Sequence, residues 1–382
     1  MSTAAGPRRF VVGAVVAGAI GLVCAPVMTA RAAKDRAPAN SCPPAFMKRA
    51  QQAVDRYRTS SRTPGVAVSF YDAGGSCFFV SGDEGRSQPS PVKPSTAFAM
   101  GSVEKVFNST LLALDLVRGR ATIDDPAARY LTADHGARVK RGAPFQKITL
   151  KELVTHTSAL PREPPHSHER IGMELYRDQP MPASVVQFLD GWRPAYAPGT
   201  KYKYSNLGFV VAGTVAVELA HEPYTKLLSD ALTGPLGMSR TGVICGSHGP
   251  GCAVAHGANG RPSSRMPVGL WTTADDMLRF IEANLGALPL RPALSRAVTL
   301  THQELFRVNA DHAVGMGWEE RHHGDALLIS KDGLDSDFSS WVGFEPNRHR
   351  GVAVLRNGGG KPGPEELGQR LLDLAGTHGD SQ

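Results

Sequence analysis

Residues 100–107 read MGSVEKVF and lead into an apolar run that continues to about Val117. This pattern predicts a helix, on which Ser102 and Lys105, three residues apart, would lie side by side. A serine hydroxyl is a weak nucleophile until a base takes its proton, and the Lys105 amine is within reach. The N–H groups at the helix start could also bind an oxyanion. The stretch indicates a nucleophile with its base; the alternative is an ordinary amphipathic helix with a surface lysine.

The composition is that of a globular protein, with 41% hydrophobic and 20% charged residues among 382, enough for one large domain or two joined lobes. The formal net charge is +7, and Arg8, Arg9 and Arg31 supply three of these charges. Removal of the segment that holds them would leave +4. So small a balance, without a block of Lys and Arg, argues against nucleic acid as a partner.

The N-terminal segment has the order of a secretory signal: paired arginines, an apolar stretch from Phe10 to Met28, and small residues. We expect cleavage after Ala32, which makes residues 1–32 a signal peptide and 33–42 a linker. The arginine pair leaves the twin-arginine route open beside the general secretory route. An uncleaved anchor is the alternative. No later segment could span a bilayer, so we expect an exported protein, periplasmic or secreted.

The mature chain would keep four cysteines, an even number that fits two disulfides in an exported protein. Cys245 and Cys252 enclose a loop rich in Gly, Pro and His and are expected to pair locally. Cys42 would then pair with Cys77 and tie the N-terminal segment to an early strand. A zinc site is the other interpretation, but the Cys-x-x-Cys spacing typical of such sites is missing.

Apolar periodicity and turn residues predict a helix and a hairpin first, helices in the middle, and strands with a last helix at the end. This order predicts an α/β fold of the α+β type, with one sheet built from both chain ends, flanking helices and an inserted all-α lobe. The sheet lobe would span 43–98 and 305–382, and the helical lobe with its active-site loops 99–304. The expected helical segments are 43–57, 102–117, 123–130, 150–155, 184–190, 207–219, 224–232, 273–284 and 364–374, and the expected strands are 65–71, 77–81, 314–319, 326–331, 339–344 and 351–355.

A proline-rich segment, 159–182, is expected to be a long loop, and loops of this length are often functional. It holds His166, His168 and Glu169, which could bind a metal. Because no third well-spaced ligand is evident, a solvated loop is the better interpretation. No metal site is therefore expected.

Two more short motifs accompany the serine and lysine. Residues 204–206 read YSN and open an apolar helix, and residues 331–333 read KDG and end a β-run that leads to Phe338. Tyr-x-Asn occurs once in the chain, whereas Lys-x-Gly occurs three times, with only Lys331 on an expected strand. Each motif alone means little, but their order along the chain is informative.

Ser-x-x-Lys, Tyr-x-Asn and a strand Lys-x-Gly, in this order, resemble the motifs of the serine β-lactamase and penicillin-binding protein superfamily. Within it the chain looks like the class C β-lactamase branch. The phrases LVTHTSALPRE (153–163), YSNLG (204–208) and GLWTTADDM (269–277) resemble AmpH-type DD-carboxypeptidase/endopeptidases, which trim peptidoglycan peptides. The likeness covers nearly the whole mature chain. It implies a β-lactamase/DD-peptidase-like fold with an antiparallel sheet.

The resemblance also implies a mechanism. Ser102 would attack the carbonyl carbon of a D-Ala peptide bond or a β-lactam, and Lys105 and Tyr204 would share the proton transfers. Water would then release the acyl group. His156 is expected to be a core histidine, and neither a metal nor an organic cofactor is implied.

The same resemblance assigns substrate-binding residues. Asn206 would orient the substrate amide, and Lys331, followed by Gly333, would hold an anionic group such as a C-terminal carboxylate. The backbone N–H groups of Ser102 and Leu334 would form the oxyanion hole.

One residue departs from the family pattern. Asp332 stands where the family has a Thr or Ser that helps to bind the carboxylate, and an anion there would repel it unless strand alternation turns the side chain away. We therefore expect a DD-carboxypeptidase/endopeptidase acting on peptidoglycan peptides. A class C-like β-lactamase, an esterase and a non-catalytic muropeptide-binding protein are the alternatives. Nothing in the sequence specifies an oligomeric state.

Overall fold

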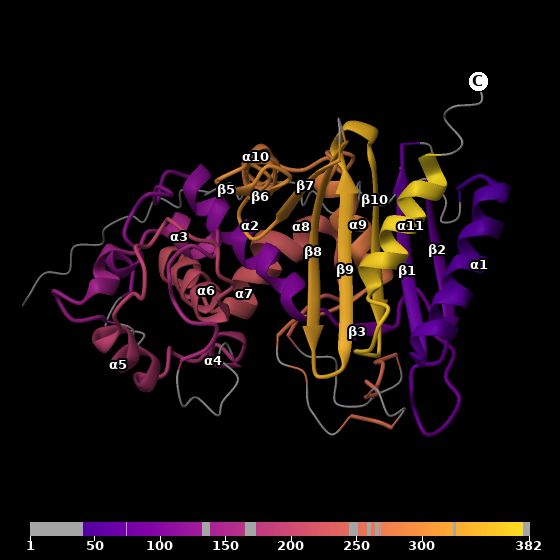
Figure 1. The fold of residues 1–382 in the computed structure, drawn as a ribbon, viewed down its shortest axis with the longest axis horizontal. Coiled ribbons are helices and arrows are strands. Elements are labelled where there is room, and N and C mark those ends of the chain that lie inside the picture. The colour runs from indigo at the N-terminus through magenta and orange to yellow at the C-terminus, as the bar shows by residue number, and fades with distance from the viewer. Residues whose placement is uncertain are drawn as a thin grey trace, which may run out of the picture. The chain divides into compact units, whose positions relative to one another are not determined.

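An antiparallel sheet built from both ends of the chain runs through the middle of the protein (Figure 1). Among the residues that the computed structural model describes, its eight strands follow the order β2-β1-β10-β9-β8-β7-β6-β5. The described residues are 41–73, 75–131, 138–164, 173–243, 251–257, 261–263, 267, 269–323 and 326–376. The strands are β1 Gly65–Asp72, β2 Gly75–Gly82, β5 Phe306–Asn309, β6 His312–Val314, β7 Glu319–His323, β8 Ala326–Asp335, β9 Phe338–Glu345 and β10 Arg350–Arg356.

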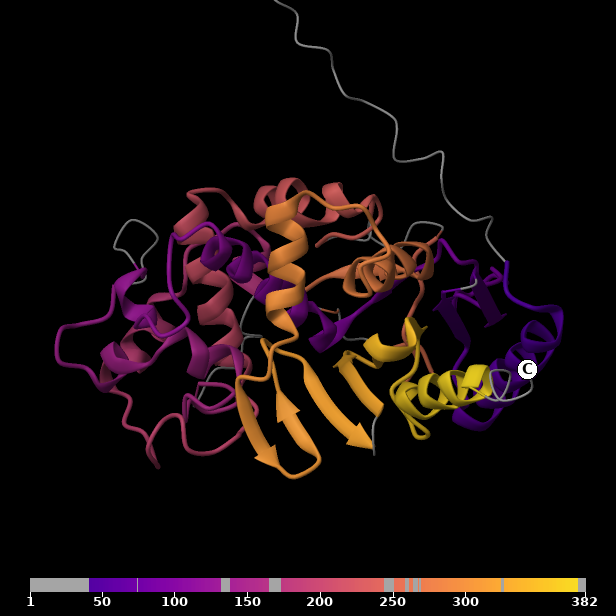
Figure 2. The same ribbon diagram turned by 90° about the horizontal axis from the view of Figure 1, so that it is seen from above.

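Helices cover both faces of the central strands. In β1, Val66 and Val68 belong to a core shared with α1 (Pro44–Ser61) and α11 (Pro364–Gly376), whereas Ala67 faces the larger core that includes α9 (Ala274–Asn284). Successive strand residues point to opposite faces, so burial on both sides explains why β1 reads as a continuous apolar run. The indigo α1 and the yellow α11 lie next to each other in both views (Figures 1 and 2).

The larger core is organised around α2 (Glu104–Val117), whose residues 105–115 are all buried. It packs against α6 and α10, and Phe107 of α2 stacks on Phe280 of α9 with ring centroids 4.4 Å apart. Most of its buried residues are apolar, as expected of a helix packed on several sides, and the polar ones among them include Lys105 and Asn108. The remaining helices and short strands are α3 Leu150–Val154, α4 Met173–Tyr176, α5 Ala183–Gly191, α6 Asn206–Ala220, α7 Tyr224–Leu228, α8 Gly234–Leu236, α10 Pro292–Thr301, β3 Ala97–Ala99 and β4 Trp271–Thr273.

Side-chain caps set where two of these helices begin. The Ser205 hydroxyl accepts a hydrogen bond from the Gly208 N–H at 3.0 Å, which starts α6 directly after Tyr204. The Thr273 hydroxyl accepts one from the Asp276 N–H at 3.1 Å and starts α9. Such caps satisfy backbone donors that have no partner inside the helix.

The predicted fold class is confirmed, but several local predictions are wrong. The expected helix 123–130 holds only the 3-10 helix Ala127–Arg129, and the expected loop 159–182 contains α4. The expected strand 314–319 is not continuous: Val314 ends β6, Glu319 begins β7, and residues 315–318 connect them. Gly317 in this connection has a φ of +81°, a conformation that strands do not use. β8 does not end at the Lys331 motif but continues to Asp335, and α10 was not predicted. The lobe boundaries at residues 98/99 and 304/305 stay predictions.

The disulfide between Cys42 and Cys77 is present, as predicted, and joins the start of α1 to β2. Cys252 is also disulfide-bonded. Cys245, the loop residues His166, His168 and Glu169, and the expected signal peptide lie outside the described residues. Within the described part of the chain, no helix has both the length and the apolar character needed to cross a bilayer.

The Cys42–Cys77 bond closes a loop with a sequence separation of 35 residues. Replacing both cysteines by serine is expected to lower the free energy of unfolding by about 4 kcal/mol, because the unfolded chain regains the entropy of the open loop. Urea unfolding followed by circular dichroism measures this change. An unchanged midpoint with an unchanged slope would contradict it.

Candidate active site

Ser102 lies in a short 3-10 turn, Gly101–Val103, that leads directly into α2. The Lys105 Nζ, from the first turn of α2, donates to the Ser102 Oγ at 3.1 Å. The Tyr204 hydroxyl, from the segment before α6, donates to the same oxygen at 2.5 Å. Both groups that touch Oγ can exchange protons with it, which is what a serine nucleophile requires.

The Tyr204 ring is held by charged and aromatic neighbours. The His156 ring centroid is 4.4 Å from that of Tyr204, and the Arg162 Cζ is 5.1 Å from it. The Nζ atoms of Lys105 and Lys331 each lie 5.2 Å from the same centroid. The phenol is therefore kept at Ser102 by packing as well as by its hydrogen bond.

His156 is a buried positioning residue, in line with the expectation of a core histidine. Its Nδ1 accepts a hydrogen bond from the Ser205 N–H at 3.1 Å, so it supports the segment that carries Tyr204. Burial, followed by the positive charges of Lys331 and Lys105, lowers the pKa of His156 well below its ordinary value. The neutral ring is the form that can accept from an N–H. Its Nε2 has no hydrogen-bond partner among the described residues.

The backbone of β8 closes against the turn that carries Ser102, and glycines permit this approach. A Cβ on Gly333 would lie 2.0 Å from the Met100 carbonyl oxygen, and a Cβ on Gly101 would lie 2.7 Å from the Leu334 nitrogen. The Ser340 hydroxyl of β9 donates to the same Met100 oxygen at 2.6 Å. The Leu334 N–H is thereby brought next to the turn of Ser102, where the predicted oxyanion hole requires it.

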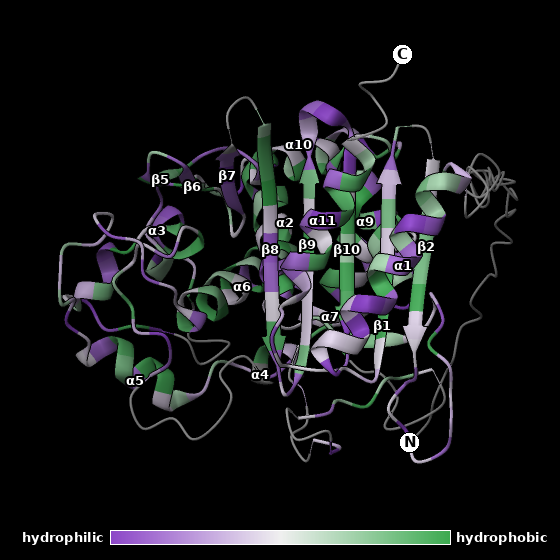
Figure 3. Ribbon diagram, turned by 45° about the vertical axis from the view of Figure 1, so that its right-hand side comes forward, coloured by the Kyte–Doolittle hydropathy of each residue, from purple (hydrophilic) through white to green (hydrophobic). Residues whose placement is uncertain are grey.

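Lys331, in the middle of β8, is buried, with 1% of its side chain exposed. Its Nζ lies 3.8 Å from the Glu319 Oε1 and 3.9 Å from the Asp332 Oδ1. Glu319 is itself held, because the Tyr202 hydroxyl donates to its Oε1 at 2.7 Å and His312 Nε2 bonds to its Oε2. The change of β8 from hydrophobic ends to a hydrophilic middle is visible in Figure 3.

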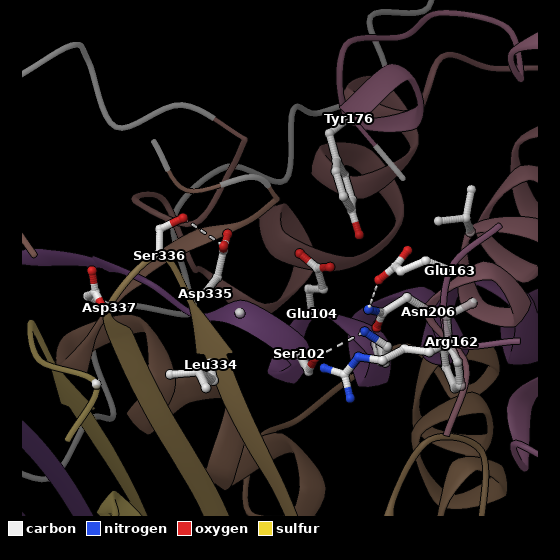
Figure 4. Close-up of a pocket in the computed structure, with 15 residues that line it drawn as sticks. Ser102, Glu104, Arg162, Glu163, Tyr176, Asn206, Leu334, Asp335, Ser336 and Asp337 are labelled. Carbon is white, nitrogen blue, oxygen red and sulfur yellow. Dashed lines mark hydrogen bonds between the residues drawn. The ribbon is translucent and has the colours of Figure 1, made fainter. Parts of the chain in front are cut away.

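Asn206 is the first residue of α6 and lines a cavity beside Ser102. Its Nδ2 donates to the Glu163 Oε1 at 2.5 Å, and its buried Oδ1 has no partner among the described residues. Figure 4 shows Glu163 and Asn206 pointing toward each other. The amide is thus held by one end, and its carbonyl oxygen can accept a hydrogen bond from a substrate N–H.

A cavity of about 520 Å³ opens beside Ser102. Glu104 and Tyr176 point toward each other across it (Figure 4), and the Tyr176 hydroxyl and the Leu270 N–H both hydrogen-bond the Glu104 carboxyl. Burial, against the opposing effect of Lys105, raises the pKa of Glu104 to about 7. The cavity is lined by Gly101, Ser102, Glu104, Lys105, Arg162, Glu163, Tyr176, Asn206, Phe209, Val210, Leu334, Asp335, Ser336, Asp337 and Gly359.

The structure brings the predicted site residues together. Serine, lysine and tyrosine are in direct contact, and Lys331 and the backbone around Gly333 and Leu334 lie next to them. Their roles in catalysis stay predictions. Glu319 belongs to no sequence motif and was not predicted as part of the site. Arg162 and Glu163 were not predicted either, although they end the phrase 153–163. Among the described residues, no group of His, Cys, Asp and Glu has the arrangement of a metal site.

Comparison with known proteins agrees with this geometry. A family model described as Beta-lactamase matches residues 50–377, which is most of the chain. The chain belongs to the β-lactamase family. It is therefore a serine hydrolase of the β-lactamase and DD-peptidase type, with a class C β-lactamase-like fold.

Relatives within the β-lactamase family carry two kinds of name. A β-lactamase of Lysobacter lactamgenus is 28% identical over 85% of this chain and 91% of its own. The D-alanyl-D-alanine-carboxypeptidase/endopeptidase AmpH of Escherichia coli K12 is 27% identical over 80% of this chain and 83% of its own. The crystal structure of the D-alanine carboxypeptidase AmpC of Burkholderia cenocepacia matches with a TM-score of 0.73 and 25% identity, over 86% of this chain and 99% of its own.

Gly333 offers a test of the contact between β8 and the serine turn. Gly333→Ala is expected to lower the free energy of unfolding by about 1–3 kcal/mol, since the new methyl overlaps the Met100 oxygen. It should also slow the expected acylation of Ser102, because β8 carries the Leu334 N–H that is predicted to belong to the oxyanion hole. Gly191→Ala is the matched control, since a Cβ there meets nothing within 4 Å. Equal stability and acylation rates for the two variants would contradict this account.

Glu104 should make stability depend on pH. Its pKa in the folded protein is about 7 against an ordinary 4.5, so the folded state holds a proton that the unfolded state loses between these values. The contribution of Glu104 to the free energy of unfolding is therefore full below pH 4.5 and is lost as the pH rises through about 7. Glu104→Gln should remove this decline. Urea unfolding of both proteins from pH 5 to 8 measures it, and a difference that stays constant with pH would show that Glu104 is not responsible.

Proposed function

We propose that the protein is an exported serine hydrolase that cleaves D-Ala-containing peptidoglycan peptides, as a DD-carboxypeptidase or endopeptidase, through an acyl-enzyme on Ser102. The observation that carries the proposal is the contact of the Ser102 Oγ with the Lys105 Nζ at 3.1 Å and with the Tyr204 hydroxyl at 2.5 Å. The names of the AmpH and D-alanine carboxypeptidase relatives support the substrate class. The signal-like N-terminal segment supports export.

The reaction proceeds in two steps. Ser102 Oγ attacks the carbonyl carbon while Lys105 and Tyr204 take its proton and pass it to the leaving amine, and the C–N bond breaks. The N–H groups of Ser102 and Leu334 stabilise the negative charge on the carbonyl oxygen. Water then attacks the ester, and the acid is released as the proton returns to Ser102.

Substrate binding follows from the cavity beside Ser102. The Asn206 Oδ1, which has no partner among the described residues, accepts a hydrogen bond from a substrate amide. The volume of about 520 Å³ accommodates part of a peptide next to the nucleophile.

A second candidate function is β-lactam hydrolysis. The Lysobacter lactamgenus relative is named a β-lactamase, and a β-lactam carbonyl can acylate the same serine. The two functions differ in how fast water releases the acyl group. The position of that water, at the ångström scale, decides between them.

The first experiment separates these functions. The intact mass of the mature protein is followed over time with a penicillin, and products are analysed with peptides that end in D-Ala-D-Ala or contain a D-Ala cross-link. A long-lived penicillin adduct together with peptide cleavage is the expected result. Ser102→Ala should abolish both.

Other results have clear meanings. Rapid penicillin turnover without peptide cleavage would favour the β-lactamase, and turnover of esters alone would favour an esterase. No adduct and no product, with a folded protein, would leave a muropeptide-binding protein. Activity that survives Ser102→Ala would remove Ser102 as the nucleophile.

A further inference from the structure

The positive charge of Lys331 is already balanced inside the site. Its Nζ is 3.8 Å from the Glu319 Oε1 and 3.9 Å from the Asp332 Oδ1, and its side chain is only 1% exposed. An ammonium group placed between carboxylates attracts a further anion weakly, because each carboxylate repels that anion. Lys331 is therefore a poor anchor for a substrate carboxylate.

The two carboxylates differ in position. Glu319 is an inner partner, with 16% of its side chain exposed, and it is fixed by hydrogen bonds to Tyr202 and His312. Asp332 is an outer partner, with 71% of its side chain exposed. Of the two carboxylates near Lys331, that of Asp332 is therefore the one that reaches solvent.

Strand alternation does not take the Asp332 carboxylate out of reach of Lys331. In the register of β8 with β9, Lys331 pairs with Val342 and Asp332 with Trp341, so their Cβ atoms point to opposite faces. The Asp332 carboxylate nevertheless lies within ion-pair distance of the Lys331 Nζ. Its charge acts beside Lys331, and Asp332 occupies the sequence position at which the family pattern has a Thr or Ser.

The cavity beside Ser102 adds to this effect. Glu104 is only partly ionised because its pKa is raised to about 7. Even without it, the acids Glu163, Asp335 and Asp337 outnumber the bases Lys105 and Arg162 among the described residues that line the cavity. A substrate carboxylate in this region would therefore meet no excess of positive charge that could offset its repulsion by Asp332.

We propose that Asp332 determines specificity by disfavouring substrates with a free carboxylate next to the scissile bond, and that the site prefers leaving groups whose carboxyl is amidated or esterified. This rests on the proposed function, namely acylation of Ser102 by a peptide. The enzyme then cleaves capped or internal D-Ala peptides faster than peptides with an ionised terminus.

The test uses one peptide in two forms, an acylated D-Ala-D-Ala with a free terminal carboxylate and the same peptide as its terminal amide. Release of D-Ala or of its amide gives kcat/KM for each form. The wild-type protein should prefer the amide by about tenfold, equivalent to roughly 1.4 kcal/mol. Asp332→Asn should shift the ratio about tenfold toward the free acid, and Asp332→Glu, which keeps the charge, should retain the preference for the amide.

Two controls make the result specific. Asp311→Asn removes an exposed aspartate in the turn between β5 and β6 and should leave the ratio at its wild-type value. Higher salt should narrow the preference in the wild-type protein, because it screens the repulsion of an exposed carboxylate, and should not do so in Asp332→Asn.

The results also separate this proposal from the function on which it rests. A wild-type preference for the free acid, or a ratio that Asp332→Asn leaves unchanged, would overturn the role of Asp332 while Ser102 acylation stands. Absence of acylation by both peptides would overturn the proposed function and this specificity with it.

Discussion

The backbone contact between β8 and the turn before α2 is the constraint on which the site depends. Gly333 lies against the Met100 oxygen, and Gly101 lies against the Leu334 nitrogen, at separations that leave no room for a Cβ. Only a close approach of this kind brings a strand N–H and the Lys331 side chain beside a serine at a helix start. The two elements are separated by more than two hundred residues, so the glycines allow the N-terminal and C-terminal parts of the chain to meet at Ser102.

Charge balance is the second constraint. Lys105 and Lys331 are buried, at 4% and 1% exposure, and buried charges require partners. Ser102 and the ring of Tyr204 partner the first, and Glu319 and Asp332 partner the second. Moving an ion pair out of water costs desolvation free energy, which is offset only when the charged groups are well placed and hydrogen-bonded. The hydrogen bonds of Glu319 with Tyr202 and His312 meet this requirement. The site thus places the buried cation of Lys331 beside carboxylates that balance its charge.

Much of the fold could be predicted from the sequence, because long apolar patterns with turn residues between them are local signals. The hairpin of β1 and β2, the helix α2 and the use of both chain ends in one sheet are examples. The strand predicted at 314–319 failed because Val314, Met316 and Trp318 are apolar whether they lie in a strand or in a buried turn. Only the positive φ at Gly317 distinguishes the two.

The sequence by itself determined the contact of Ser102 with Lys105, since a spacing of three residues on a helix places two side chains together wherever the helix lies. It also determined which side chains could do chemistry at Tyr204 and Lys331. Only the tertiary structure decided that Tyr204, 102 residues away, touches Ser102, and that Glu319 and Asp332 share the Lys331 ammonium. The periodicity of a sequence indicates the face of a helix or strand to which each Cβ points. Contacts between distant segments, and the position of the carboxylate at the end of a flexible side chain, depend on how the whole chain packs.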